Sequence, residues 1–366
     1  MSGITPITMP KWGLTMEEGT VVKWAVKAGD LISQEQELVD IETTKLANVY
    51  ESPVDGTLRR IVAAEGEVVP VGALIAVVAG NDVADEEIDA FIAESNRDVV
   101  RVAAGPVPET IALPGGQVTY LKVGPEDGEP VVFVHGFGAD HKGWVLNQSA
   151  ISESHPTFAL DLPGHGASYK RAEDLSASAL AEALLSFLNK LDLKNVHLVG
   201  HSLGAAVAAL AAASSGSNVK TLTLIAPAGL GSKINGPFFD GFIVETRAKK
   251  LRPIIEMLVS DPGIISADMV EDVLKFKRLD GAQEALTAVR AANFPGSEQT
   301  VSIGPAIEAL KIPILVILGA EDKVIPPFQT KELLSANVVE VPGAGHIPHL
   351  EKASDVNQRI QAHFGS

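Results

Sequence analysis

The chain has 366 residues, 46% of them hydrophobic and 20% charged, which predicts a globular protein of two or more domains. Its formal net charge of -17 at pH 7 disfavours nucleic acid or an anionic membrane as partner, because both require clustered basic side chains. The absence of cysteine excludes disulfides and thiolate metal sites, and with no apolar run long enough for a bilayer and no signal peptide we expect a cytoplasmic protein without a metal.

The N-terminal part contains an imperfect internal repeat. One offset of 37 residues places Gly19 on Gly56, Gly29 on Gly66, and the apolar pair 38–39 on residues 75–76. Both copies alternate apolar and polar residues in short stretches with glycines at the turns, as β-strands do. A repeated strand unit that cannot bury its own apolar face packs against its copy, so the repeat predicts a small two-sheet sandwich.

Lys45 lies midway between the two copies. The pattern predicts one strand ending near Glu42 and another over residues 47–50, which places Lys45 at a hairpin tip. Such tips are exposed to modifying enzymes. Residue type alone leaves two interpretations, a solvated turn lysine and a modification site.

Residues 3–79 resemble the biotinyl/lipoyl domain family, in which a hairpin-tip lysine bears the cofactor. The resemblance rests on the run around Lys45, on residues 9–13 (MPKWG) and on residues 52–56 (SPVDG). Biotin carriers usually place Met on both sides of the lysine, whereas Thr44 and Leu46 stand here, so the resemblance implies lipoate attached to Lys45 by a lipoate ligase. Most lipoyl domains have Asp before the lysine and Ala after it. Thr44 and Leu46 differ from these residues, and the difference bears on which ligase and which partner enzyme recognise the tip.

Residues 80–108 are expected to form an acidic and Pro/Ala-rich linker. Within it Ile88, Phe91 and Ile92 recur at helical spacing, which predicts a short helix near residues 84–95 able to dock on a partner.

From residue 109 onward, short apolar strands alternate with helical stretches, which predicts a parallel sheet covered on both faces. Ligands bind beyond the carboxyl ends of such strands. The predicted strands are residues 131–134, 157–160, 196–199, 222–225 and 314–318.

Residues 199–206 (VGHSLGAA) match the strand, tight turn and helix of a nucleophile elbow around Ser202. A serine needs a base that removes its proton and a third group that orients the base. Downstream, Asp322 ends a predicted strand and His346 follows in a glycine-rich loop, in the chain order that this elbow expects. Glu321 is the less favoured acid, and a helix-capping Asp322 with a loop-bound His346 is the alternative.

Residues 135–138 (HGFG) follow the first predicted strand of this domain. Glycines there allow the amides of Phe137 and Leu203 to converge on an oxyanion. His135 and His165 are interpreted as structural hydrogen-bonding residues. Together these motifs resemble the α/β-hydrolase superfamily over residues 110–366, with residues 228–300 as its helical lid.

A lipoyl-type and a hydrolase-type half in one chain resemble the dihydrolipoamide acetyltransferase components of acetoin dehydrogenase complexes. The resemblance implies transfer of acetyl from the lipoyl arm on Lys45 to coenzyme A through Ser202, His346 and Asp322. It also implies two partners, a thiamine-diphosphate-dependent acetoin dehydrogenase component and dihydrolipoamide dehydrogenase. A basic cluster is either a solvated helix face or a contact for the CoA phosphates: Arg247, Lys249, Lys250 and Arg252.

Two alternatives to this function stay open at the sequence level. The first is a lipoyl-fused esterase or thioesterase with water as the acceptor, because the same triad performs hydrolysis. The second is a noncatalytic lipoyl scaffold, which an intact triad disfavours.

Overall fold

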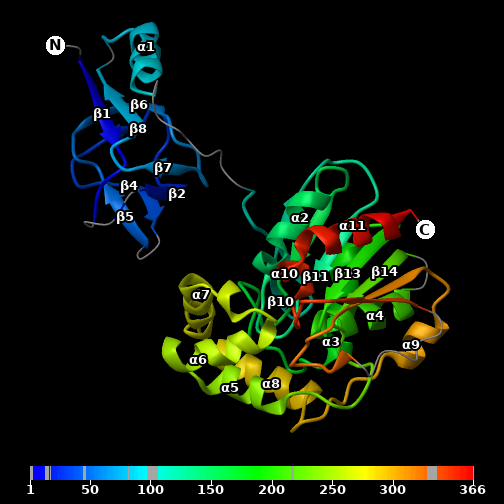
Figure 1. Ribbon diagram of the computed structural model, residues 1–366. Helices are drawn as coiled ribbons and strands as arrows, with labels where there is room; N and C mark the ends of the chain where they lie inside the picture. Colours follow the sequence, from blue (N-terminus) through cyan, green and yellow to red (C-terminus); the bar gives the residue numbers. More distant parts are fainter. Residues whose placement is uncertain are drawn as a thin grey trace. The chain divides into compact units, whose positions relative to one another are not determined.

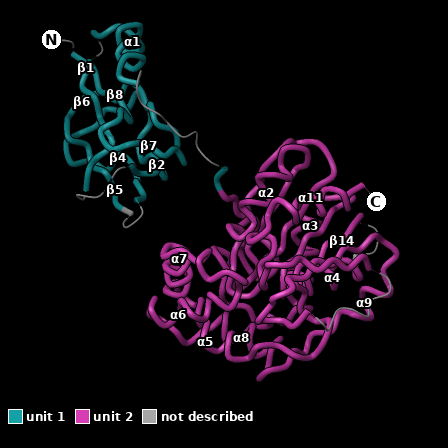
Figure 2. The backbone as a smooth tube through the Cα atoms, in the orientation of Figure 1, with its two compact units in different colours: residues 1–107 teal, residues 108–366 magenta. Residues whose placement is uncertain are grey.

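The computed structural model describes residues 3–12, 16, 18–43, 47–80, 82–96, 106–215, 218–327 and 336–365. The chain divides into two compact units, residues 1–107 and residues 108–366, coloured separately in Figure 2. Each unit has its own hydrophobic core. No helix in the described part of the chain combines the length and the apolar character needed to cross a membrane.

Unit 1 is a sandwich of two four-stranded antiparallel sheets, ordered β1-β8-β6-β3 and β5-β4-β2-β7. The 37-residue offset maps β2, β3 and β4 onto β6, β7 and β8, so each copy of the repeat supplies strands to both sheets. This confirms the sandwich expected from the repeat. The strands are β1 (Ile4–Thr8), β2 (Glu18–Trp24), β3 (Leu31–Ile32), β4 (Glu37–Glu42), β5 (Ala47–Glu51), β6 (Gly56–Ile61), β7 (Val68–Pro70) and β8 (Leu74–Ala79).

The strands that flank Lys45 form an antiparallel pair. Glu42, the last residue of β4, lies opposite Ala47, the first residue of β5. Lys45, Thr44 and Leu46 fall outside the described residues, so the tip position of Lys45 stays a prediction that the flanking register supports.

Helix α1 (Asp85–Ser95) forms within residues 80–108, the segment expected to be a linker with a short helix. Its Ile88 is fully buried in a cluster with Leu74, Val77 and Val83. Arg59 on β6 donates hydrogen bonds to the carbonyl oxygens of residues 80 and 83 and to the Asp85 carboxylate. The helix is where the spacing predicted it, but it packs on the sandwich of its own chain.

Unit 2 is built on an eight-stranded sheet ordered β16-β15-β14-β13-β11-β12-β10-β9. The strands from β16 to β12 run parallel, and β10 is antiparallel to both neighbours. This confirms the α/β fold, and the β9–β10 hairpin is an addition that the pattern did not predict. The strands are β9 (Glu109–Leu113), β10 (Gly116–Val123), β11 (Val131–Val134), β12 (Thr157–Leu160), β13 (Val196–His201), β14 (Val219–Ile225), β15 (Ile314–Gly319) and β16 (Asn337–Val341).

Helices cover both faces of this sheet (Figure 1). Alternate residues of a strand point to opposite faces. Val132 and Val134 accordingly pack in the cluster of α3 (Ala177–Lys190) and α4 (Leu203–Ser215). Their neighbours Val131 and Phe133 pack in the cluster of α2 (Val145–Ile151) and α11 (Ala353–Phe364).

The segment between β14 and β15 is mainly helical and includes residues 228–300, the expected lid. Figure 1 draws α5 to α8 next to one another, in yellow-green to orange. Its elements are α5 (Gly236–Val244), α6 (Ala248–Ile255), η2 (Glu256–Leu258), η3 (Pro262–Ile264), α7 (Ala267–Lys277), α8 (Ala282–Asn293) and α9 (Gly304–Ala309).

Candidate active site

Ser202 occupies a sharp turn between β13 and α4. Its φ of 54° lies in the left-handed region, which is uncommon for a residue other than glycine. The turn requires glycine on both sides. A Cβ on Gly200 would lie 2.4 Å from the Gly204 carbonyl oxygen, and one on Gly204 would lie 2.2 Å from that of Val134. These contacts explain the G-x-S-x-G spacing.

Ser202, His346 and Asp322 form one hydrogen-bonded chain. The Ser202 Oγ lies 3.0 Å from His346 Nε2, and His346 Nδ1 lies 2.7 Å from Asp322 Oδ2. An ionised carboxylate only accepts, so Nδ1 bears the hydrogen and Nε2 presents its lone pair to the serine. The arrangement can therefore remove the Ser202 proton.

Backbone hydrogen bonds hold the acid and the base of this chain in place. Asp322 Oδ1 accepts the N–H groups of Val324 and Ile325, at 2.7 and 2.9 Å. The neighbouring Glu321 accepts instead from Gly343 and Ala344, in the loop that leads to His346. Of the two carboxylates considered from the sequence, Asp322 is therefore the one that hydrogen-bonds to His346.

Two further contacts fix the backbone of His346. The His346 N–H donates to the carbonyl oxygen of Leu258 in the lid segment, at 2.8 Å. His201 Nε2 donates to the His346 carbonyl oxygen, also at 2.8 Å. Burial, together with the neighbouring histidines His349 and His346, holds the pKa of His201 well below its ordinary value, so this ring is neutral.

The amides of Phe137 and Leu203 are the two predicted oxyanion donors. Neither N–H donates a hydrogen bond to any residue that the structure describes. A Cβ on Gly136 would lie 3.0 Å from Ser202 Cβ, which places the Gly136–Phe137 peptide against the nucleophile. His135 Nδ1 donates to the Gly136 carbonyl oxygen at 2.8 Å and so orients that peptide.

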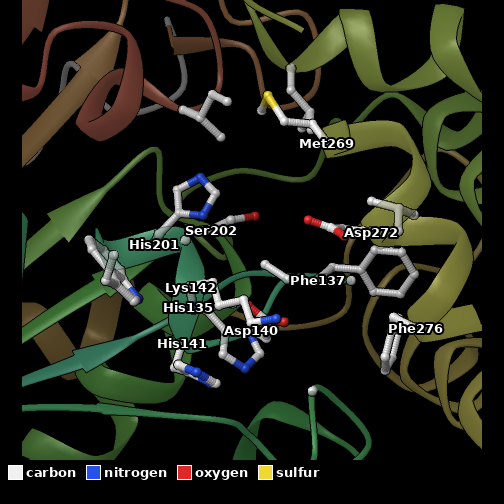
Figure 3. A pocket seen from close by; sticks show the side chains of 18 of the residues that line it. His135, Phe137, Asp140, His141, Lys142, His201, Ser202, Met269, Asp272 and Phe276 are labelled. Atoms are coloured by element: carbon white, nitrogen blue, oxygen red, sulfur yellow. Dashed lines mark hydrogen bonds between the residues drawn. The ribbon is translucent and has the colours of Figure 1, made fainter. Parts of the chain in front are cut away.

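Ser202 opens into a cavity of about 690 Å³ (Figure 3). Most of the wall is apolar, with lid residues facing the strand ends. The lining includes Phe137, Trp144, Phe238, Phe239, Phe242, Ile255, Leu258, Met269, Val273, Phe276, Leu279, Ile347 and Leu350.

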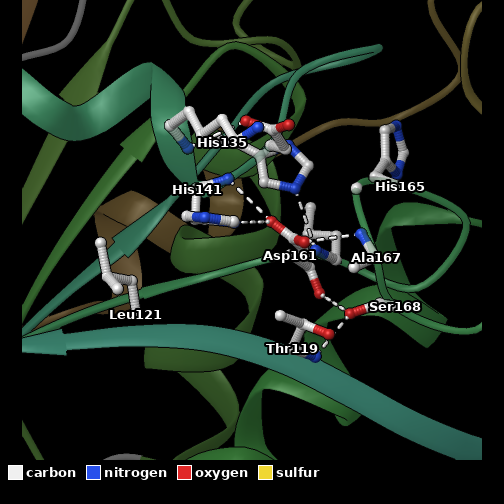
Figure 4. A network of polar contacts seen from close by, with 12 residues as sticks. Thr119, Leu121, His135, His141, Asp161, His165, Ala167 and Ser168 are labelled. Carbon is white, nitrogen blue, oxygen red and sulfur yellow. Dashed lines mark hydrogen bonds and ion pairs between the residues drawn. The ribbon is translucent and has the colours of Figure 1, made fainter. Parts of the chain in front are cut away.

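A buried polar network lies behind the loop of residues 135–141 (Figure 4). Asp161 is fully buried at the end of β12, and its carboxylate accepts from His141 and from the Ala167 N–H. His135 Nε2 accepts the Leu162 N–H at 2.9 Å, so both ring nitrogens of His135 bond to backbone. His165 Nδ1 bonds to the carbonyl oxygen of residue 163. His135 thus bonds to the backbone of two loops, as expected, whereas the bond of His165 stays within its own loop and its role in joining loops stays a prediction.

Comparisons with known proteins identify both halves of the chain. Residues 5–78 match the model of the biotin-requiring enzyme domain, and residues 131–359 match that of the alpha/beta hydrolase family. The dihydrolipoyllysine-residue acetyltransferase component of the acetoin cleaving system of Pseudomonas putida is 40% identical over 99% of both chains. The chain belongs to this acetyltransferase family.

Other matches agree with this membership. The protein of the same description from Cupriavidus necator is 37% identical, over 99% of this chain and 98% of its own. Among solved structures, a 2-hydroxy-6-oxo-6-phenylhexa-2,4-dienoate hydrolase from a Rhodococcus strain shares the fold at a TM-score of 0.65 and 20% identity. That match covers 72% of this chain and 99% of the hydrolase.

In this member of the acetyltransferase family, the basic cluster predicted to contact CoA does not line the cavity. Arg247, Lys249 and Lys250 are exposed on or beside α6, and Arg252 bonds to Glu256 and to the carbonyl oxygen of residue 265. The lysines that do line the cavity are Lys142 and Lys275. Charge clustering along the sequence could not show which way α6 faces.

Sequence reasoning missed three polar residues at this site, namely His141, Asp161 and His201. His201 is next to the nucleophile in the elbow motif, a position that could have suggested it. The pairing of His141 with Asp161 joins two loops 20 residues apart and left no local signal.

Proposed function

We propose that this chain transfers an acetyl group from a dihydrolipoyl arm on Lys45 to coenzyme A, in the cleavage of acetoin. The main support is the combination of a lipoyl-type unit and a hydrogen-bonded Ser202–His346–Asp322 chain in one protein whose relatives, similar over the full length, are named as such acetyltransferases. The hydrolase fold alone would fit an esterase equally well.

Lys45 is the proposed attachment residue for lipoate. The β4–β5 register, with Glu42 opposite Ala47, leaves four residues to connect the strands, and Lys45 is one of them. A short connection between paired strands suits a ligase that must reach one lysine. The lipoyl group supplies the thiol that bears the acetyl cargo.

The chemistry of the chain's own residues begins at Ser202. His346 Nε2 removes the hydroxyl proton while Asp322 holds the ring at Nδ1, and Oγ attacks the acetyl carbonyl carbon. The amides of Phe137 and Leu203 donate to the oxyanion. The acetyl group then rests on Ser202 until the CoA thiol takes it, and the apolar lid wall keeps water from intercepting it.

The partners proposed for this chain follow from the same chemistry. A thiamine-diphosphate-dependent acetoin dehydrogenase component would load the arm, dihydrolipoamide dehydrogenase would reoxidise it, and a lipoate ligase would attach it. Thr44 and Leu46 next to Lys45 are the residues by which these enzymes would select this unit. Thr44→Asp and Leu46→Ala introduce the residues that most lipoyl domains have at these positions. Together they should slow the loading of acetyl onto the arm by the acetoin dehydrogenase component.

Two measurements test this function. The intact mass of the full chain from its native host should include a lipoyl increment that Lys45→Arg loses; an unmodified wild-type chain would contradict the carrier role. With acetyl-dihydrolipoamide as donor, acetyl release should depend on CoA and yield acetyl-CoA. Equal release of acetate without CoA would instead indicate a thioesterase.

A further inference from the structure

His141 and Asp161 form a second imidazole–carboxylate pair in the wall of the same cavity. His141 begins η1 (His141–Trp144), and both its backbone N–H and its ring Nδ1–H donate to Asp161 Oδ1, each at 2.8 Å. Asp161 Oδ2 accepts the Ala167 N–H at 2.7 Å. The proposed mechanism so far uses neither residue.

The free nitrogen of this second pair is available to a ligand. His141 lines the cavity together with Ser202, as Figure 3 shows, and its side chain keeps 9% of its surface exposed. Its Nε2 makes no hydrogen bond with any described residue, and it is not a fully enclosed atom. The pair therefore shares with His346 on Asp322 an Nδ1 that is held on a buried carboxylate, and its Nε2 has no partner among the described residues.

The surroundings of His141 favour its charged form, in contrast to those of His135 and His201, where burial lowers the pKa. Burial would lower its pKa, but the hydrogen bond and charge of Asp161, with the charge of Asp140, raise the pKa above its ordinary value. Lys142 on the same loop opposes this, and His135, at the end of β11, is kept neutral by burial, which lowers its pKa. Ring nitrogens held in this way suit proton transfer near neutral pH.

Acetyl transfer between two thiols moves two protons, one belonging to Ser202 and one belonging to the acceptor thiol. A single histidine can accept and return these two protons only one after the other. Two imidazoles in one cavity allow each proton its own base, because His346 is already committed to the Ser202 proton.

We propose that His141, oriented by Asp161, carries the proton of the thiols while His346 carries the proton of Ser202. This inference rests on the proposed acetyl transfer through Ser202. In the first half, Oγ gives its proton to His346, the new C–O bond forms as the C–S bond breaks, and the departing dihydrolipoyl thiolate takes the proton of the His141 imidazolium. In the second half, neutral His141 takes the proton of the CoA thiol, the thiolate attacks, the C–O bond breaks, and His346 returns its proton to Oγ. Both histidines end as they began.

This division of labour favours a thiol over water as acceptor. The thiolate is the reactive nucleophile, and the imidazolium that forms when His141 takes the thiol proton stabilises the thiolate. Water is a far weaker acid than a thiol, so an imidazole does not ionise it in the same way. A second His–Asp pair in the cavity would therefore favour acetyl transfer to a thiol over hydrolysis by water.

The test compares His141→Asn with wild type in the full chain. Asn places an amide N–H where Nδ1 was, so Asp161 keeps its donor while the cavity loses Nε2. The initial burst of p-nitrophenol from p-nitrophenyl acetate needs only Ser202 and His346 and should stay within about twofold. Transfer from acetyl-dihydrolipoamide to CoA should fall at least ~10-fold, since acid–base groups contribute about 10²–10⁴-fold, and more of the acetyl should be lost to water.

Two results would overturn the proposal. Transfer by His141→Asn within about twofold of wild type would reduce His141 to a structural partner of Asp161, and so would a parallel loss of burst and transfer. His141→Gln, which keeps the backbone N–H to Asp161 but has no titratable ring, is the second variant if the Asn variant fails to fold. Ser202→Ala, measured alongside, separates the two ideas: transfer that survives in Ser202→Ala refutes the acyl-serine, whatever the His141 variants show.

Discussion

At the scale of single residues, adjacent carboxylates at the end of β15 have different roles. Asp322 bonds to the His346 ring, whereas Glu321 bonds to two backbone N–H groups of the loop before His346. The histidine needs an acceptor at Nδ1 to present a lone pair at Nε2. Of these two neighbouring side chains, Asp322 therefore sets which nitrogen of His346 bears the hydrogen, and Glu321 holds the loop before His346 in place.

This separation predicts opposite phenotypes for Asp322→Asn and Glu321→Gln. The first should lower kcat for acetyl transfer by ~10²–10⁴-fold with little change in Tm, because the ring takes the wrong tautomer. The second, as matched control, should lower Tm and leave kcat within about threefold. Steady-state kinetics and thermal unfolding measure both. Loss of activity in Glu321→Gln with an active Asp322→Asn would contradict the assignment.

Buried histidines predict acid sensitivity of the folded state. Burial, with nearby histidines, lowers the pKa of His165 and of His349 to about 3 in each case. The unfolded chain binds these protons near pH 6.5, so stability is complete above that pH and declines as pH falls toward 3. The free energy of unfolding should drop by about 1.4 kcal/mol per pH unit for each histidine.

Denaturant unfolding at pH 7, 6, 5 and 4 measures this slope. His349→Phe removes one of the two groups while keeping a ring against Trp144, from which His349 lies 4.6 Å between centroids. The variant should show a shallower pH dependence. An unchanged slope would show that His349 does not titrate in this way.

At the scale of elements, α1 shows that the spacing of apolar residues predicts a helix but not the surface on which it packs. The spacing of Ile88, Phe91 and Ile92 predicts a helix, and α1 confirms it. What the helix covers is the outer face of the sheet β1-β8-β6-β3, where Leu74 and Val77 of the preceding strand β8 lie. The spacing of apolar residues within α1 contains no information about that face.

Removal of the buried side chain should detach this helix from the sandwich. Ile88→Ala is expected to cost about 2–5 kcal/mol of local stability, the usual range for truncating a buried isoleucine. Hydrogen exchange of the α1 amides should speed up, while Glu87→Ala, on the exposed side, should leave it unchanged. Equal exchange in both variants would contradict the packing.

The site itself was predictable where chemistry imposes a local pattern. The elbow needs glycines around Ser202, and the acid and base follow strand ends, so all three residues could be selected from the sequence. His141 and Asp161 could not, because their contact depends on how two loops meet above β11 and β12. For the same reason, the sequence could not show whether the basic residues on α6 face the cavity.

At the scale of the whole molecule, a net charge of -17 opposes the binding of anionic CoA, so the site needs local cations. Lys142 and Lys275 line the cavity, and Lys142 is exposed there. Lys142→Ala should raise the KM for CoA several-fold and leave the p-nitrophenyl acetate burst unchanged. Lys249→Ala, away from the cavity, is the matched control. A larger KM effect in the control would restore the basic cluster on α6 as the CoA contact.

The central claim is that acetyl passes through Ser202 on its way from the lipoyl arm to CoA. Mass spectrometry of the full chain, incubated with acetyl-dihydrolipoamide and no CoA, tests it most directly. We predict an acetyl increment on the peptide that contains Ser202, its disappearance when CoA is added, and loss of both the increment and the transfer in Ser202→Ala. Transfer at the wild-type rate in Ser202→Ala, with no acetylated peptide in wild type, would contradict the account.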